Sequence, residues 1–326
     1  MNQPTAHITE KNVAIICPTK NQSDKILRLL HSVDQLFVPP AQIIIADSSD
    51  NFKQISLEAF PKLNLKHLKC ETQGQILQRN FARNFLDDEI DLVLHIDDDN
   101  TFVPNSLNCL LQTWNLEVSR PKVKQLAGMS FNVLDIPIEN TSWARRFAFL
   151  GTRVSGAVSI AGYASPYVPA KQTQEVSWLL GGSTAWSREI LDKHPHPIQY
   201  ATKWAVCEDL MFSYPLKQNY RLIVAKDAVA FHNSDYSDMS FQNAMFFGLS
   251  SSIMRYNFVC QNRELRFYAY VWMTLGIIVG SLFKGVCGRH LYFGIFFGNI
   301  EGLSRALLCS AFGQDYEKLA RMLANR

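Results

Sequence analysis

The sequence lacks the features that mark several common protein classes. Its seven cysteines are scattered and none forms a CxxC pair, which argues against both a zinc site and a disulfide framework. A net charge of +3 over 326 residues gives no support for a nucleic-acid partner. Residues 1–12 are polar and contain no apolar stretch, so we expect no secretory signal there. The chain is 47% hydrophobic, which is enough for one large domain or for a domain with an appendage.

The most informative stretch is 92–100, where an apolar run with strand character ends in three consecutive aspartates. Asp97, Asp98 and Asp99 repel one another, so a chain tolerates them when a cation neutralises them or when they point into water. Mg²⁺ and Mn²⁺ prefer such oxygen clusters, usually completed by water and substrate phosphates. The carboxyl ends of strands are also where open α/β sheets bind ligands. We therefore predict a metal–diphosphate site here, and the alternative is a solvated acidic turn.

The N-terminal region has the pattern of a strand–helix–strand unit. Apolar runs at 13–17 and 42–47 flank a segment, 25–36, with apolar residues at helical spacing. This order predicts a parallel βαβ unit with a right-handed crossover. Asp47 then lies at the carboxyl end of the second strand. Its carboxylate is suited to accept hydrogen bonds from a nucleobase N–H or a ribose hydroxyl, and the alternative is an ordinary turn aspartate.

Two arginines precede the acid triplet on a predicted helix, 73–84. Arg79 and Arg83 are four residues apart, so they share one helical face. Two guanidinium groups on one face are suited to clamp a diphosphate. The alternative is that they pair with the acidic residues at 87–89, which is the commoner fate of surface arginines.

Three later motifs are also candidates for function. Gly181 and Gly182 allow the backbone to approach a ligand closely, or else form an ordinary turn. Glu208 and Asp209 open a mostly apolar segment, where they either act as a general base or complement a helix dipole. His232 ends a predicted strand, and we interpret it as a third metal ligand or as a packing residue.

The remaining elements follow from hydrophobic periodicity and turn residues. We predict a strand at 65–69, a strand with its turn at 125–135, one or two strands at 221–232, a helix at 107–118 and another that begins at 187. The pattern of 139–169 assigns no elements.

Taken together, these motifs resemble the family 2 glycosyltransferases, which have the GT-A fold, and are most similar to the bacterial branch that builds surface polysaccharides. The motifs occur in family order: the 13–17 strand with Pro18-Thr19-Lys20-Asn21, Asp47, Gln78-Arg79-Asn80, Asp97-Asp98-Asp99, Gly181-Gly182, Glu208-Asp209 and His232. The resemblance implies an α/β fold of GT-A type, in which helices flank a Rossmann-type mixed, mainly parallel sheet, with a helical segment added at the C-terminus.

The resemblance also implies a role for each matching residue. A nucleotide-diphosphate sugar would be bound by Pro18, Thr19, Asn21, Asp47, Arg79, Asp97 and Asp98. A Mn²⁺ or Mg²⁺ ion would be held by Asp99, Asp97 and His232. Asp209, with Glu208, would supply the catalytic base, and Gly181, Gly182 and Trp178 would border the acceptor.

The activity implied is metal-assisted glycosyl transfer with inversion, to a hydroxyl of a glycan or a lipid-linked acceptor. The metal would stabilise the leaving diphosphate, and a carboxylate would accept the proton of the acceptor hydroxyl. Two alternatives stay open: a sugar-phosphate nucleotidyltransferase, and a non-catalytic protein that binds a nucleotide sugar. The first is disfavoured because a glycine-rich loop with Arg or Lys does not follow Cys17.

The C-terminal region contains an uncharged stretch at 267–283 and a second apolar stretch at 291–300, with basic residues around them. A spanning helix needs about 20 apolar residues, so these stretches favour an interfacial helix pair at a membrane surface. The alternative is a helical hairpin packed on the catalytic domain or on a second subunit, which would make the protein a homo-oligomer. We therefore expect a catalytic domain at 1–240, a helical segment at 241–326, and a cytoplasmic protein peripheral to the inner face of the cell membrane.

Overall fold

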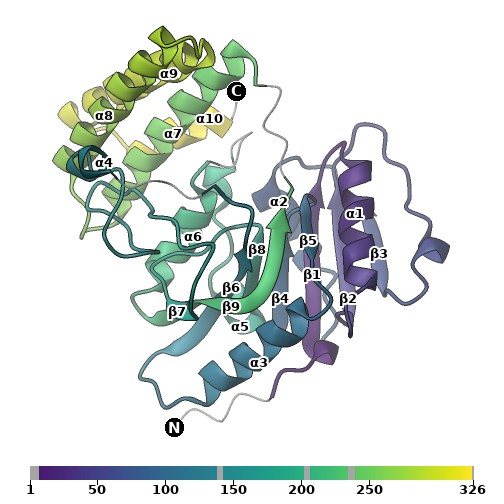
Figure 1. Cartoon of the computed structure of the whole chain (residues 1–326). Helices are drawn as coiled ribbons and strands as arrows, with labels where there is room; N and C mark the ends of the chain where they lie inside the picture. The colour runs from purple at the N-terminus through teal and green to yellow at the C-terminus, as the bar shows by residue number, and fades with distance from the viewer. Residues whose placement is uncertain (1–6, 138–141, 202–205, 234–238, 325–326) are drawn as a thin grey trace. The chain divides into compact units, whose positions relative to one another are not determined.

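The computed structural model describes residues 7–137, 142–201, 206–233 and 239–324 (Figure 1). The chain forms two compact units, which are treated separately below. The first unit comprises 1–138, 167–196 and 212–234, and the second comprises 139–166, 197–211 and 235–326. The second unit thus includes 139–166 and 197–211, which both precede residue 240. The predicted boundary between a catalytic domain and a helical segment at residue 240 stays a prediction.

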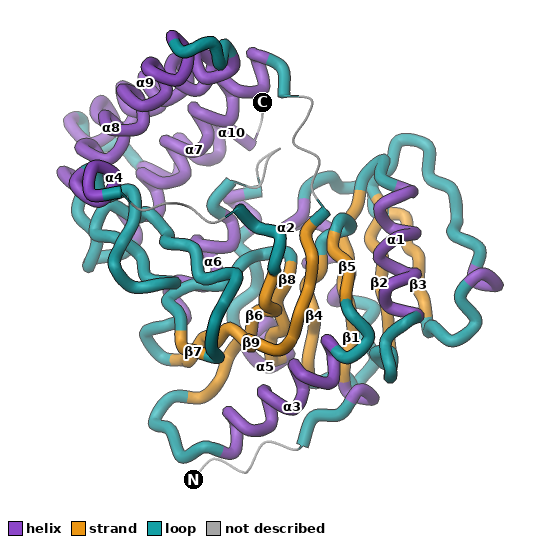
Figure 2. The backbone as a smooth tube through the Cα atoms, in the orientation of Figure 1, coloured by secondary structure: helices purple, strands orange, loops and turns teal. Residues whose placement is uncertain are grey.

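The first unit is built on four adjacent parallel strands in the order β3-β2-β1-β4 (Figure 2). They are β1 (Val13–Thr19), β2 (Gln42–Asp47), β3 (Leu65–Lys69) and β4 (Leu92–Ile96). Every residue of β1, β2 and β4 is buried, as expected for strands covered on both faces. The predicted strands are confirmed, and the parallel order brings the ends of β1, β2 and β4 to one edge.

Five further strands extend the sheet beyond β4. They are β8 (Ser183–Ser187), β6 (Gln125–Val133), β9 (Tyr220–His232), β5 (Asn100–Phe102) and β7 (Gln174–Glu175). The order continues β4-β8-β6-β9-β5, with β7 paired to β9. The β6–β9 pair is parallel and the other pairs are antiparallel, so the sheet is mixed. The predicted α/β class, with a mixed sheet, is confirmed.

The first unit contains α1 (Ser23–Asp34), α2 (Gln75–Arg83), α3 (Ser106–Ser119) and α5 (Arg188–Lys193). The first two are strongly amphipathic and bury their apolar stripes, for example Ile26, Leu29, Leu30 and Val33 of α1. All four helices coincide with predicted ones to within two residues at their N-terminal ends. Short 3₁₀ turns, Glu10–Asn12 and Leu57–Ala59, complete the connections.

The second unit is helical. It contains α4 (Trp143–Phe147), a 3₁₀ turn (Ile198–Tyr200), α7 (Phe241–Gln261), α8 (Phe267–Val286), α9 (Leu291–Ala311) and α10 (Tyr316–Ala324). A further helix, α6 (Glu208–Leu216), begins in this unit. The C-terminal helical segment that the sequence predicts is confirmed.

Small residues explain how α7 and α9 approach each other so closely. A Cβ at Gly294 would lie 2.7 Å from the Phe241 carbonyl oxygen, and one at Gly298 would overlap the Met245 carbonyl oxygen. The two backbones are therefore in direct contact along this seam. Of the described helices, α8 alone is long and apolar enough to cross a membrane, with a mean hydropathy of 1.5, and a third of its most apolar window is buried.

Candidate active site

The candidate site follows the carboxyl edge of the parallel strands. β1 is the central strand, since it pairs with β2 on one side and with β4 on the other. Thr19, its last residue, is in register with Asp47 of β2. On the other side, the Thr19 hydroxyl donates a hydrogen bond of 2.6 Å to Asp98. One threonine thus connects the Asp47 region with the acid triplet.

The Asp47 carboxylate is held by a hydrogen-bond network within the first unit. Its Oδ1 accepts from the Ser49 backbone N–H at 2.7 Å, and its Oδ2 lies 3.0 Å from His67 Nε2. The other ring nitrogen, Nδ1 of His67, accepts from the Ile55 backbone N–H at 3.0 Å. The histidine therefore carries its proton on Nε2 and donates it to Asp47. Both oxygens of Asp47 are fixed in place before any ligand arrives.

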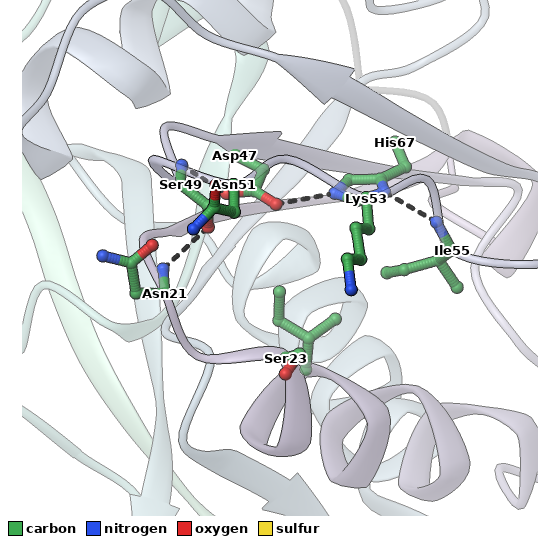
Figure 3. A pocket seen from close by; sticks show the side chains of 9 residues that line it. Asn21, Ser23, Asp47, Ser49, Asn51, Lys53, Ile55 and His67 are labelled. Carbon is green, nitrogen blue, oxygen red and sulfur yellow. Dashed lines mark hydrogen bonds and ion pairs between the residues drawn. The ribbon is translucent and has the colours of Figure 1, made fainter.

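A cavity of about 260 Å³ opens beside Asp47 (Figure 3). Seven of its nine lining residues are polar, namely Asn21, Ser23, Asp47, Ser49, Asn51, Lys53 and His67, and the other two are Ile26 and Ile55. Figure 3 shows Lys53 extending into the cavity between the Asp47–His67 pair and Ser23 of α1. Among the predicted site residues, Asn21 and Asp47 line this cavity.

Two predicted residues of the same region have a different setting. The sequence analysis ended the first strand at residue 17, but Pro18 and Thr19 both belong to β1. A proline is tolerated in this central strand because the pairing of β1 with β4 ends at Ile16. The Ser48 N–H donates to the Thr19 carbonyl, so the backbone of Thr19 bonds towards β2. Because the backbone groups of successive strand residues point to opposite sides, the nitrogen of Pro18 points towards β4, where no ladder bond is lost.

Asp97, the first acid of the triplet, is fixed by Arg79 of α2. The guanidinium NH2 lies 2.9 Å from Asp97 Oδ1, and the arginine side chain is only 1% exposed. Gln75 Nε2 lies 3.4 Å from the same oxygen. On the other side, a Cβ at Gly182 would overlap the Asp97 carboxylate, so this position requires glycine. A direct contact of Arg79 with a diphosphate stays a prediction, while its observed contact positions Asp97.

Asp98 is partly buried and hydrogen-bonded to Thr19. Burial, together with the neighbouring Asp97 and Asp99, raises the pKa of Asp98 to about 6, while the Thr19 hydrogen bond opposes the rise. The nearby Lys25 does not offset this burial, so the ionised form of Asp98 is disfavoured.

Asp99 faces the end of β9. Its Oδ1 lies 3.3 Å from His232 Nε2, and its Oδ2 lies 4.0 Å from Lys25 Nζ. Burial raises the pKa of Asp99, which His232 and Lys25 oppose and Asp97 reinforces. The short strand β5 explains the proximity, since its first residue, Asn100, pairs with His232.

The described residues contain no group of three or more His, Cys, Asp or Glu side chains close enough to hold a metal ion. The donors at the triplet nevertheless suit a hard divalent cation, because Asp99 Oδ1 is buried and accepts no hydrogen bond. With Asp97 committed to Arg79 and Asp98 to Thr19, the side chains best placed to contribute are Asp99 and His232.

The predicted acceptor-side residues belong to the first unit. The Gly182 carbonyl accepts hydrogen bonds from Asp97 N–H and Asn100 Nδ2, both at 2.9 Å, so this glycine is tied to the acid triplet. Trp178 is buried, and its ring packs edge-on against Tyr167 with centroids 5.2 Å apart. Gly181 follows Leu180, whose N–H donates to the Tyr167 hydroxyl. Their acceptor role stays a prediction.

The predicted catalytic acids belong to the second unit, at the start of α6. Glu208 is buried, and Asp209 Oδ1 accepts from the Leu210 N–H at 2.7 Å. Cys207, just before them, has a positive φ of 61°, which turns the chain sharply into the helix. Their role as base stays a prediction.

Arg83 does not pair with the acids at 87–89, as the sequence alternative proposed. Its Nη2 lies 2.8 Å from Asp192 Oδ1. Asp87 pairs instead with Lys66, whose Nζ lies 2.9 Å from Asp87 Oδ1. Arg79 and Arg83 therefore have separate ionic partners and do not act as one clamp in this structure. Sequence spacing did not reveal these partners because both are distant in the chain.

Sequence comparison identifies the family of this region. Residues 14–118 match the family model described as glycosyl transferase family 2. This segment is similar in sequence to the family 2 glycosyltransferases. The predicted resemblance, and with it the prediction of a glycosyltransferase, is confirmed. The matched segment includes Asp47, Arg79 and the acid triplet. Comparison with curated protein sequences gives no match.

Several solved glycosyltransferase structures have a similar fold. The mannosyltransferase PcManGT from Pyrobaculum calidifontis, in complex with GDP-Man and Mn²⁺, has 13% identity and a TM-score of 0.50 over 93% of this chain and 88% of its own. Residues 1–349 of S. aureus TarS give 14% identity and a TM-score of 0.51 over 96% and 90%. GalNAc-T7 with UDP, GalNAc and Mn²⁺ has 15% identity and a TM-score of 0.52, over 69% of this chain and 44% of its own. These similarities support the GT-A fold.

Proposed function

We propose that this glycosyltransferase binds a nucleotide-diphosphate sugar along the carboxyl edge of β1, β2 and β4. The nucleobase occupies the Asp47 cavity and the diphosphate lies at the acid triplet. The observation that carries the proposal is the continuous link from Asp47 through Thr19 to Asp98, which joins a polar cavity to a carboxylate cluster on one edge. The similar structures solved with GDP-Man and Mn²⁺, and with UDP, GalNAc and Mn²⁺, support this donor class.

The Asp47 cavity suits a nucleobase because its hydrogen-bonding groups are already fixed. The Ser49 N–H and the His67 Nε2–H orient the Asp47 carboxylate, which leaves its remaining lone pairs for a base N–H. Asn21 and Asn51 add amide donors and acceptors to the same lining. A preorganised polar cavity lowers the entropic cost of binding a planar ligand.

A divalent cation, Mn²⁺ or Mg²⁺, completes the donor site, held by Asp99 and His232 with Asp97 beside them. When bound, the cation stabilises the negative charge that develops on the leaving diphosphate. Arg79 keeps Asp97 in place, and Thr19 keeps Asp98 in place, so the cluster needs little reorganisation to accept the ion.

The transfer itself is a single displacement. The acceptor hydroxyl oxygen, from a glycan or a lipid-linked acceptor, bonds to the anomeric carbon while the bond to the diphosphate oxygen breaks. The leaving nucleoside diphosphate takes the electron pair, and Asp209 accepts the hydroxyl proton. We assign Asp209 rather than Glu208 as the base because Glu208 is the more buried of the two. The configuration at the anomeric carbon inverts.

A ligand panel tests the proposal. Thermal stabilisation is measured with UDP-, GDP-, dTDP- and CMP-sugars, with and without Mn²⁺. Release of the nucleoside diphosphate, or of CMP from a CMP-sugar, is measured with water as the acceptor. One nucleotide family is expected to stabilise the protein in a Mn²⁺-dependent way. Asp209→Asn is expected to keep this stabilisation and to reduce release by about 10²–10⁴-fold. The exposed Asp88→Asn serves as the matched control.

The outcomes separate the parts of the proposal. No Mn²⁺-dependent stabilisation by any nucleotide sugar would refute the donor site. Stabilisation without any release in the wild type would favour a non-catalytic binding protein. Unchanged release in Asp209→Asn would refute the assignment of the base while leaving the donor site intact.

A further inference from the structure

The helix α8 has its large apolar side chains on the wrong face for a core helix. Seven of them are exposed: Tyr268, Trp272, Leu275, Val279, Leu282, Phe283 and Val286. At 100° per residue they fall within an arc of about 100°, which makes one continuous stripe along the helix. A stripe of this width is normally buried against the rest of the protein.

The opposite face of α8 is the one that packs inside the second unit. Its buried residues are smaller or polar on average: Ala269, Tyr270, Met273, Thr274, Ser281 and Gly285. A Cβ at Gly285 would lie 3.0 Å from the Phe293 ring of α9, so this face is already in close contact. The exposed stripe is therefore separate from the face of α8 that packs inside the second unit.

The short helix α4 extends this stripe sideways (Figure 1). The Phe147 and Trp272 rings meet edge to face with centroids 5.4 Å apart, and Trp272 Nε1 donates to the Phe147 carbonyl at 3.0 Å. A Cβ at Gly276 would lie 2.9 Å from the Ala148 Cβ. Trp143 and Phe147 are both exposed. We call the exposed side chains of α4 and α8 the α4–α8 face.

The charged side chains of α4 and α8 are all positive. From Leu265 to Ile300 the sequence contains no Asp or Glu. Arg266 at the start of α8, Lys284 near its end and Arg289 after it are exposed, as is Arg146 of α4. An apolar, aromatic-rich face on a helix with basic residues at both ends is complementary to anionic lipid headgroups above hydrocarbon.

We propose that the α4–α8 face lies in the interfacial layer of an anionic phospholipid bilayer, with α8 parallel to the membrane plane. A spanning orientation is disfavoured because Thr274 and Ser281 face protein, which leaves only one side of the helix for lipid. A second copy of the chain is disfavoured because α4 and α8 of both copies would contribute only positive charges to a two-fold contact. The inference goes beyond the proposed donor chemistry, and it supports a peripheral location at the inner face of the cell membrane.

Vesicle sedimentation tests the proposal on the full chain, without nucleotide sugar or Mn²⁺. Neutral phosphatidylcholine vesicles are compared with vesicles that contain about 30% phosphatidylglycerol. We expect binding to the anionic vesicles, about tenfold weaker binding to neutral ones, and reversal by high salt. Phe283→Gln with Val286→Gln is expected to weaken binding about tenfold or more.

The matched control is Phe37→Gln with Val123→Gln, which removes the same side chains from exposed positions in the first unit. This control is expected to bind like the wild type. Wild-type protein that stays in the supernatant with both vesicle types would overturn the proposal, as would equal binding by Phe283→Gln/Val286→Gln. A wild-type dimer by light scattering that becomes monomeric in this variant, with no vesicle binding, would assign the face to a second copy. Because no donor is present, these results are independent of the ligand panel.

Discussion

The two ends of the candidate site hold their carboxylates in opposite ways. Asp47 has a neutral N–H donor on each oxygen, from Ser49 and His67, and is complete without a ligand. Asp98 and Asp99 share a crowded strand end, have raised pKa values, and include a buried oxygen that accepts no hydrogen bond. One end is organised for an uncharged polar group and the other needs a positive charge. This difference matches the two halves of a nucleotide-diphosphate sugar with its cation.

The contrast between these ends is an electrostatic one. Neutral donors fix a carboxylate without altering its net charge, so the Asp47 end is suited to read hydrogen-bonding patterns. At the triplet, Arg79 contacts Asp97, and Lys25 and His232 lie near Asp99, yet burial still dominates the pKa of Asp98. Mutations at the two ends are therefore expected to separate nucleobase recognition from cation binding.

The largest effect is expected at the triplet itself. Asp99→Asn removes the negative charge that lies nearest His232, so the cation loses its best ligand. We expect nucleoside diphosphate release to fall about 10³-fold and the Mn²⁺-dependent thermal shift to disappear, as it does with a chelator. Binding of the free nucleoside is expected to persist. Asp88→Asn is the control, and a variant that keeps its response to Mn²⁺ would contradict the assignment.

Gly182→Ala tests whether the triplet depends on its packing. The added Cβ overlaps the Asp97 carboxylate, so Asp97 must move away and its contact with Arg79 is disturbed. A displacement of this kind costs about 10²-fold in turnover. Gly280→Ala is the matched control, because its Cβ would meet no atom within 4 Å. Crystal structures of both variants with Mn²⁺ measure the displacement, and an unmoved Asp97 would refute this account.

The sequence predicted the parallel strands and their helices well because each has a clear apolar pattern. It also placed Asp47 and Asp97–Asp99 at strand ends, which parallel order then brought to one edge. It missed β5 (Asn100–Phe102), since three residues carry too little periodicity, although this strand sets Asn100 opposite His232. Short elements of this kind are determined by their partners.

Other parts of the site depend on contacts that no local pattern encodes. His67 is one residue in a short strand, and its importance appears only when Asp47 is found 3.0 Å away. The match between Gly182 and Asp97 joins residues far apart in the chain. In α8 the apolar stretch was evident, but sequence alone did not show that its larger side chains face outward. Burial gives that information and periodicity does not.

A smaller effect is expected from His67→Phe at the nucleobase end. The change removes the N–H donor to Asp47 Oδ2 and the acceptor of the Ile55 N–H. Leaving these buried groups unpaired costs about 2 kcal/mol, or about 30-fold in donor affinity. The affinity for Mn²⁺ is expected to stay within a factor of about two of the wild type. His7→Phe, at an exposed position, is the control. Equal losses in donor and cation affinity, measured by calorimetry, would show that the two ends are not separable.

The smallest effect is a pH dependence confined to the triplet. The pKa of Asp98 is raised from 3.8 to about 6, so the ionised form is disfavoured in the metal-free protein. The protonated carboxyl therefore stabilises the folded protein at low pH, and this contribution to the free energy of unfolding is lost as pH rises through 6. A cation binds the ionised form, hence its affinity falls as pH drops below 6. We expect Mn²⁺ to bind about tenfold more weakly at pH 5 than at pH 7, measured by calorimetry.

In Asp98→Asn this pH dependence shrinks, and the metal-free protein melts at a higher temperature at pH 7.5 than the wild type. Because the raised pKa of Asp99 acts in the same direction, a residual dependence is expected in that variant. An unchanged pH profile in Asp98→Asn would mean that Asp98 does not sense the cation, and the charge deficit would then belong to Asp99 alone.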